Sequence, residues 1–140
     1  MRFEIAPKKG VGLIEFGMKV DRVRALIGAT PKSFKRTPLS KHPLDYFECE
    51  GMFVNYDAAG RVEAFEFDDS AELTLKGESI QGMSPQGVKR LIQNAGANFQ
   101  ESDVSIVSND LGLSFWFPVK DDEPDSPAQS VLVFRDGYFN

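Results

Sequence analysis

The chain has 140 residues, 41% of them hydrophobic and 26% charged, and its formal net charge is −5 at pH 7. This length predicts a single domain over residues 1–140, with a core large enough to exclude any need for disulfides or a structural metal. The single cysteine, Cys49, excludes an intramolecular disulfide. No apolar run approaches the roughly 20 residues of a membrane span, and charges interrupt residues 1–9, where a secretion signal would be apolar. We therefore expect a cytoplasmic protein with no membrane partner.

Charge is distributed unevenly along the chain. Residues 1–41 contain ten Lys or Arg and three Asp or Glu, whereas residues 42–140 contain six and eighteen. An acidic field of that size repels nucleic acid and speeds association with a cationic protein. We therefore expect a protein partner with a basic surface and no direct binding of nucleic acid. The alternative is that the acidic side chains only maintain solubility.

One phrase of the sequence occurs twice. Gly17–Ile27 and Gly82–Ile92 carry Gly, Met, Val, Leu and Ile at matching positions. A repeat of this length indicates two copies of one supersecondary unit. We expect the copies to occupy residues 1–69 and 70–140, with approximate boundaries.

Each copy of the phrase predicts a short helix. Apolar residues at helical spacing indicate a first helix over Val20–Ile27, which Gly28 ends. The second helix begins after Ser84, a good N-cap, with Pro85 at the first helical position, and stops near Gly96. Both helices are short, so they need tertiary packing to be stable.

Short aromatic and β-branched runs around the helices predict strands. These runs are Arg2–Ile5 or Val11–Phe16, Asp45–Cys49, Met52–Tyr56, Arg61–Phe67, Ala71–Gly77, Val104–Val107, Leu111–Phe117 and Ser130–Phe134. Each unit then consists of a lead-in strand, a helix and about three antiparallel strands. The predicted fold class is α+β: two tandem repeats share one antiparallel sheet, with both helices packed on one face and the other face left to solvent or a partner.

No residue pattern points to catalysis or to a cofactor. His42 is the only histidine and has no second metal ligand nearby in sequence, and Cys49 alternates with Phe47 as a small buried hydrophobe would. The acidic loop fails the EF-hand test because Ser126 and Leu132 stand where glycine and glutamate are required. We therefore expect no catalytic residue, no metal and no cofactor. The basic patch over residues 32–36 with Lys41 predicts a solvated edge or a steering surface.

Several motifs carry a family resemblance. Gly10–Gly28, read as Gly-x-Gly-x-Ile-x-Phe-Gly-Met followed by a helix ending Leu-Ile-Gly, resembles the opening of small bacterial proteins with a β-lactamase-inhibitor-protein-like tandem architecture. Tyr46-Phe47, Phe53–Asp57, Gly60–Ala64 and Gly137-Tyr138 extend the resemblance over most of the chain. Some proteins of this kind are immunity proteins, which bind toxins delivered by neighbouring bacteria. The resemblance implies a noncatalytic antitoxin that occludes the active site of its cognate toxin, for example a basic nuclease of contact-dependent growth inhibition.

The candidate toxin-binding residues are the acidic side chains of the strands and of the later loop. They are Glu63, Glu66, Asp68, Asp69, Glu72, Asp121, Asp122, Glu123 and Asp125. Two alternatives stay open. The first is a small-ligand or enzymatic domain whose open sheet face is lined by aromatic residues, namely Tyr56, Phe65, Phe67, Phe115 and Trp116. The second is a homo-oligomeric module, whereas the immunity hypothesis expects a monomer or weak dimer when free.

Overall fold

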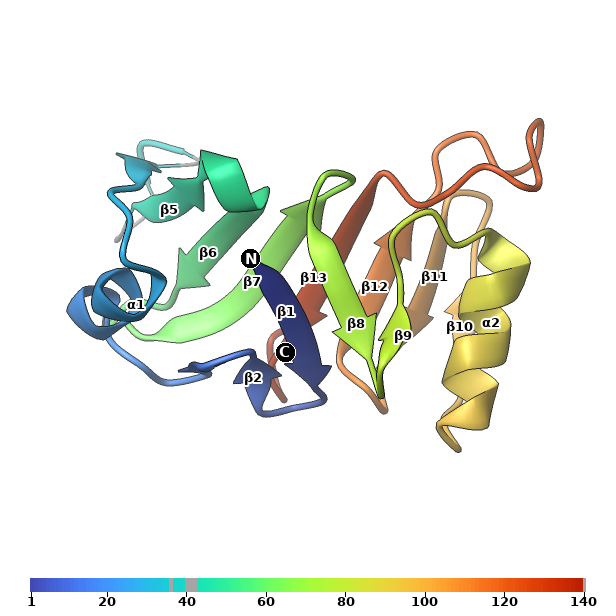
Figure 1. Cartoon of the computed structure of the whole chain (residues 1–140), viewed down its shortest axis with the longest axis horizontal. Helices are drawn as coiled ribbons and strands as arrows, with labels where there is room; N and C mark the ends of the chain where they lie inside the picture. The colour runs from blue at the N-terminus through green and yellow to red at the C-terminus, as the bar shows by residue number, and fades with distance from the viewer. Residues whose placement is uncertain (36, 40–42, 140) are drawn as a thin grey trace.

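Two α-helices and thirteen strands form the described part of the chain, residues 1–35, 37–39 and 43–139 of a computed structural model (Figure 1). The α-helices are α1 (Val20–Ile27) and α2 (Pro85–Asn94), and a 3-10 turn covers Glu48–Glu50. The predicted α+β class is confirmed, as is the predominance of antiparallel strands.

Eight strands form a large antiparallel sheet. In spatial order they are β10 (Gln100–Glu101), β11 (Ser105–Ser108), β12 (Leu113–Trp116), β13 (Ser130–Phe134), β7 (Val62–Asp68), β6 (Met52–Tyr56), β5 (Leu44–Phe47) and β4 (Lys32–Phe34). Each half of the chain therefore supplies four consecutive strands, and the two sets meet where β13 pairs with β7.

The lead-in strands form a second, smaller sheet. Its order is β3 (Ile14–Glu15), β2 (Gly10–Val11), β1 (Arg2–Ala6), β8 (Glu72–Leu75) and β9 (Glu78–Ser79). We predicted one shared sheet, but β1 and β8 pair with each other in parallel and do not join the large sheet. The reason is burial: Phe3, Ile5, Leu73 and Leu75 are all buried, which places this sheet over the core as a separate layer.

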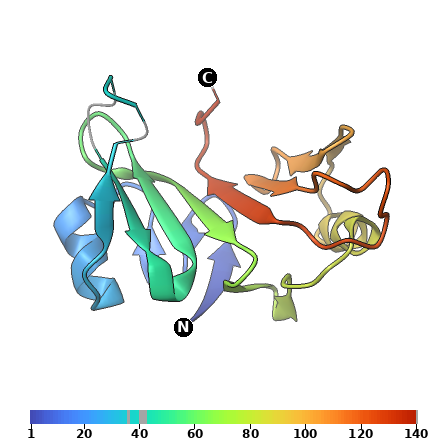
Figure 2. The same ribbon diagram turned by 90° about the horizontal axis from the view of Figure 1, so that it is seen from above.

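The two helices and the small sheet lie along the same side of the large sheet (Figures 1 and 2). Val23 and Ile27 of α1, and Val88 and Ile92 of α2, belong to one buried cluster with the strand residues that point to that side. The side chains of the large sheet that alternate with these core residues form the opposite surface, which we call the open face.

The helix boundaries follow the sequence signals. Helix α1 covers the predicted residues and ends at Gly28. The Ser84 hydroxyl accepts a hydrogen bond from the backbone N–H of Gly87 at 3.2 Å, and Pro85 begins α2. Capping of this kind stabilises a short helix by about 1 kcal/mol.

The prediction for Cys49 was wrong. Strand β5 ends at Phe47, and the chain then turns through the 3-10 segment, so the alternation that was expected to bury Cys49 stops two residues earlier. The thiol is exposed. The predicted basic edge is present in part, because β4 is an exposed strand at the margin of the large sheet. Arg36, Lys41 and His42 lie outside the described residues.

Candidate protein-binding surface

One cross-strand row runs over the whole open face. Strand pairing places its members directly opposite one another, from β4 to β10. They are Lys32, Tyr46, Phe53, Glu66, Leu132, Ser114, Val107 and Gln100. All are partly or fully exposed, whereas their neighbours along the inner strands are buried. The row gives this face a mixed aromatic, aliphatic and acidic character.

Aromatic side chains gather at the β4–β6 end of the open face. Tyr46 and Phe53 stack with ring centroids 4.3 Å apart, and Phe34 meets Phe53 edge-on at 6.4 Å. Phe34 is 44% exposed. Exposed aromatic rings held by their neighbours provide contact area at little entropic cost, as at protein interfaces.

A shallow hollow lies beside this aromatic group, over β7, β13 and β12. It is lined by Phe53, Glu66, Phe67, Asp68, Ser114, Trp116, Ser130 and Leu132. Trp116 is 47% exposed and stands at its far wall. The hollow therefore combines three aromatic residues, of which Phe67 is buried, with two carboxylates, and among its lining residues both charged groups are acidic.

The acidic residues predicted on the strands, Glu63 to Glu72, do not form one cluster in the structure. Glu66 and Asp68 share the open face because they are two residues apart on β7. Asp69 is exposed in the following turn, where it lines a second cleft with Asp68. Glu72 is on β8 in the small sheet, with its Oε2 atom 3.9 Å from Nε of Arg2. Only Glu66 and Asp68 are therefore brought together on this face.

Glu63 lies at the opposite end of β7, in a cluster with Arg135. Nη2 of Arg135 is 3.3 Å from Oε2 of Glu63, and Nη1 is 3.2 Å from Oδ2 of Asp57. Burial raises the pKa of Glu63 by more than Arg135 lowers it. Partial burial acts to raise the pKa of Asp57, but backbone N–H groups of Arg61 and Ala59, together with Arg135, hold it below its usual value. These contacts fasten β13 to the turn after β6.

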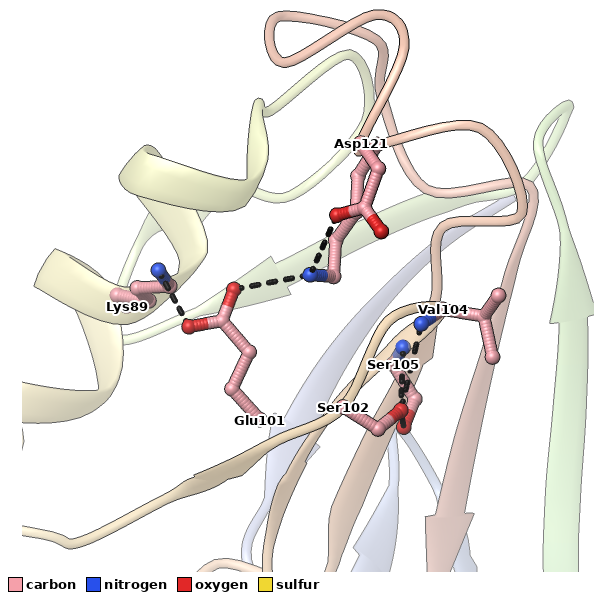
Figure 3. Close-up of polar contacts among 7 residues, drawn as sticks. Lys89, Glu101, Ser102, Val104, Ser105 and Asp121 are labelled. Carbon is pink, nitrogen blue, oxygen red and sulfur yellow. Dashed lines mark hydrogen bonds and ion pairs between the residues drawn. The ribbon is translucent and has the colours of Figure 1, made fainter.

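The loop acids lie at the other end of the molecule. Asp121, Asp122, Glu123 and Asp125 are all exposed. Nζ of Lys120 lies 3.8 Å from Oδ1 of Asp121 and 3.1 Å from Oε2 of Glu101 (Figure 3). Oε1 of Glu101 is 2.6 Å from Nζ of Lys89 on α2. Lys120 thereby anchors the start of this loop to β10 and α2.

The predicted aromatic lining of the open face was wrong in four of its five residues. Tyr56, Phe65, Phe67 and Phe115 are at most 8% exposed and point into the core, and only Trp116 is on the open face. Sequence reasoning missed the aromatic residues that are there, Phe34, Tyr46 and Phe53. Strand alternation was an available signal for Phe53, which lies between the buried Met52 and Val54 of β6. It did not mark Phe34, because β4 is exposed throughout, or Tyr46, because Leu44 has the same parity and is buried.

A buried polar group supports the same half of the sheet. The carboxylate of Asp45 is fully buried, and it accepts hydrogen bonds from Arg24 and from the hydroxyl of Tyr56 at 2.8 Å. Burial and the bond to Asp45 raise the pKa of Tyr56 far above its usual value, so this hydroxyl stays protonated. The group ties α1 to β5 and β6 and keeps the aromatic end of the open face in position.

Two further properties bear on chemistry. Among the described residues, no three His, Cys, Asp or Glu side chains are grouped so that they could hold a metal ion. No helix within the described ranges has both the length and the apolar content needed to cross a membrane.

Comparison with known proteins returns nothing for this chain: no protein-family model, no curated protein and no solved structure matches it.

Proposed function

We propose that this chain is a noncatalytic inhibitor, an immunity protein that binds a cognate bacterial toxin and occludes its active site. The observation that carries the proposal is the open face, where exposed aromatic residues lie next to Glu66 and Asp68. Interfaces that bind tightly combine a few aromatic anchors with complementary charge. The net charge of −5 favours a toxin with a basic surface, such as a nuclease.

The proposal includes the remaining features inferred from the sequence. The two halves of the chain are tandem copies of one unit, since α1 and α2 are each followed by four antiparallel strands. The helices of both copies cover the same face and leave the other for the toxin. The protein acts in the cytoplasm, is a monomer or weak dimer when free, and needs no metal or cofactor.

Growth protection tests this function directly. Toxin candidates encoded beside the gene for this chain are expressed in a sensitive bacterium, with and without the chain. We expect one candidate to arrest growth and the chain to restore it, and the two purified proteins to form a stable complex. If the chain relieves none of the toxins and binds none of them, the immunity proposal is wrong.

Charge reversal then distinguishes the two acidic regions. Glu66→Lys with Asp68→Lys places two positive charges on the open face, and Asp122→Lys with Glu123→Lys does the same on the exposed loop. We expect the first pair to abolish protection and the second to weaken it by slowing association. Undiminished protection by both variants would refute the electrostatic mechanism.

A further inference from the structure

The hollow on the open face has a defined shape because of one serine. Strand pairing places Ser130 of β13 between Asp68 of β7 and Trp116 of β12. Neighbouring strands are about 4.8 Å apart, so Asp68 and Trp116 rise from backbones roughly 10 Å apart. In this paired row the small serine side chain is the one between them. The result is a slot with a carboxylate on one wall and an indole ring on the other.

The next row along the strands completes the slot. Glu66 is opposite both Phe53 and Leu132, so a second carboxylate and a second aromatic ring border the same hollow. Oδ1 of Asp68 accepts hydrogen bonds from the backbone N–H and the hydroxyl of Ser70, which fix the orientation of this carboxylate. Its Oδ2 atom accepts none from the described residues.

We propose that this slot binds an arginine side chain of the partner protein, with the guanidinium plane against Trp116 and its N–H groups donating to Asp68 and Glu66. This inference rests on the proposed function and names the group that the toxin supplies. A guanidinium is planar, stacks on aromatic rings and donates in pairs to carboxylates. A lysine ammonium is compact and strongly hydrated, and it matches a flat slot less well.

Trp116 is the only tryptophan of the chain, so its fluorescence reports on the slot. The probes are three capped tripeptides, acetyl-Gly-X-Gly-amide, in which X is arginine, lysine or citrulline. Citrulline has nearly the shape of arginine but carries no charge. We expect the arginine peptide to change the Trp116 emission in a saturable way, with the lysine peptide several-fold weaker and the citrulline peptide at least about tenfold weaker. Equal binding of all three peptides, or no saturable change with arginine, would overturn the inference.

Variants locate the binding on the molecule. Glu66→Gln and Asp68→Asn keep the size of each side chain and remove its charge, and each should weaken the arginine peptide by about tenfold. The matched control, Glu78→Gln with Asp103→Asn, removes two exposed acidic charges elsewhere and should leave the affinity unchanged. Because Asp68 also binds Ser70, circular dichroism and thermal unfolding establish that each variant is folded before its affinity is compared. Equal weakening by the control pair would show that the peptide responds only to net charge, and this outcome contradicts a slot.

The toxin complex separates this inference from the proposed function. If the chain protects against a toxin but Trp116→Leu and Glu66→Gln bind that toxin normally, the arginine slot is wrong and the immunity function stands. If the arginine peptide binds as described but no toxin is neutralised, the slot stands and the immunity function is wrong.

Discussion

Arg24 on α1 makes a two-point ion pair with Asp45 on β5, with Nε 3.0 Å from Oδ2 and Nη2 2.7 Å from Oδ1. The two residues have very different surroundings, because the Arg24 side chain is 39% exposed and the Asp45 side chain is fully buried. A carboxylate in the interior is tolerated only where its oxygen atoms are paired. Arg24 therefore allows β5 to carry an acid inside the core.

Removal of this guanidinium should leave Asp45 buried, with the Tyr56 hydroxyl as a side-chain partner among the described residues. We expect Arg24→Ala to lower the free energy of unfolding by about 3 kcal/mol, measured by urea denaturation at pH 7. Arg22→Ala, two positions earlier on the exposed side of α1, is the matched control and should change it by less than about 0.5 kcal/mol. Similar midpoints for the two variants would show that the buried pair does not stabilise the fold.

Adjacent residues on β12 test which face of the large sheet is open. Phe115 is fully buried and Trp116 is 47% exposed, so the two side chains point to opposite sides of one strand. We expect Phe115→Ala to destabilise the protein by about 3 to 5 kcal/mol and Trp116→Ala by less than about 1 kcal/mol. Thermal unfolding of both variants measures the difference. A larger loss for Trp116→Ala would mean that another layer covers this face.

The sequence was sufficient for the helices because each boundary has its own chemical signal, such as Ser84 and Pro85 before α2. It was less informative for the strands that form the edges. Strands β4 and β10 are exposed throughout, so no apolar alternation marks them. Their positions depend on pairing with β5 and β11, and the local sequence of β4 and β10 gives no sign of this pairing.

The open face was assigned to the wrong side chains for a related physical reason. In β6, Met52, Phe53 and Val54 are consecutive and apolar, so hydrophobicity alone does not say which of them points inward. The packing of the core decides it, because Met52 and Val54 belong to one buried cluster with residues of the small sheet and the helices, and Phe53 does not. The acidic residues were predicted as two clusters, one on the strands and one on the loop, but within the first cluster Glu63 and Glu72 have partners elsewhere, Arg135 and Arg2.

The two lysines that contact Glu101 predict that the stability of the protein depends on pH. A hydrogen bond from Lys89 lowers the pKa of Glu101; burial opposes this, and a second bond from Lys120 adds to it (Figure 3). A carboxylate whose folded-state pKa is lowered contributes stability above its unfolded pKa, near 4.3, and loses it as the pH falls through the folded value. We expect Glu101→Gln to lower the free energy of unfolding by about 1 kcal/mol at pH 7. The difference should almost vanish at a pH where Glu101 is protonated in both the folded and the unfolded wild type.

Urea denaturation of the wild type and of Glu101→Gln between pH 7 and pH 3 measures this effect. Glu78→Gln is the matched control, because Glu78 is exposed on β9. Its stability should follow that of the wild type at every pH. A Glu101→Gln difference that does not depend on pH would assign the loss to packing and exclude the ion pairs as its cause.

Gly51 lies against Asp68, which forms one wall of the hollow. Its φ angle is +62°, and a Cβ atom placed there would lie 2.3 Å from Oδ1 of Asp68. Gly77 has a φ of +81° with no atom within 4 Å of such a Cβ. A substitution there therefore measures the backbone strain alone, without a steric contact. We expect Gly77→Ala to lower the free energy of unfolding by about 1 kcal/mol. Gly51→Ala should lower it by about 1 kcal/mol more, because Asp68 must move away from Ser70. Amide NMR shifts at Ser70 should change only in Gly51→Ala, and equal costs with an unchanged Ser70 signal would show that Gly51 does not position this carboxylate.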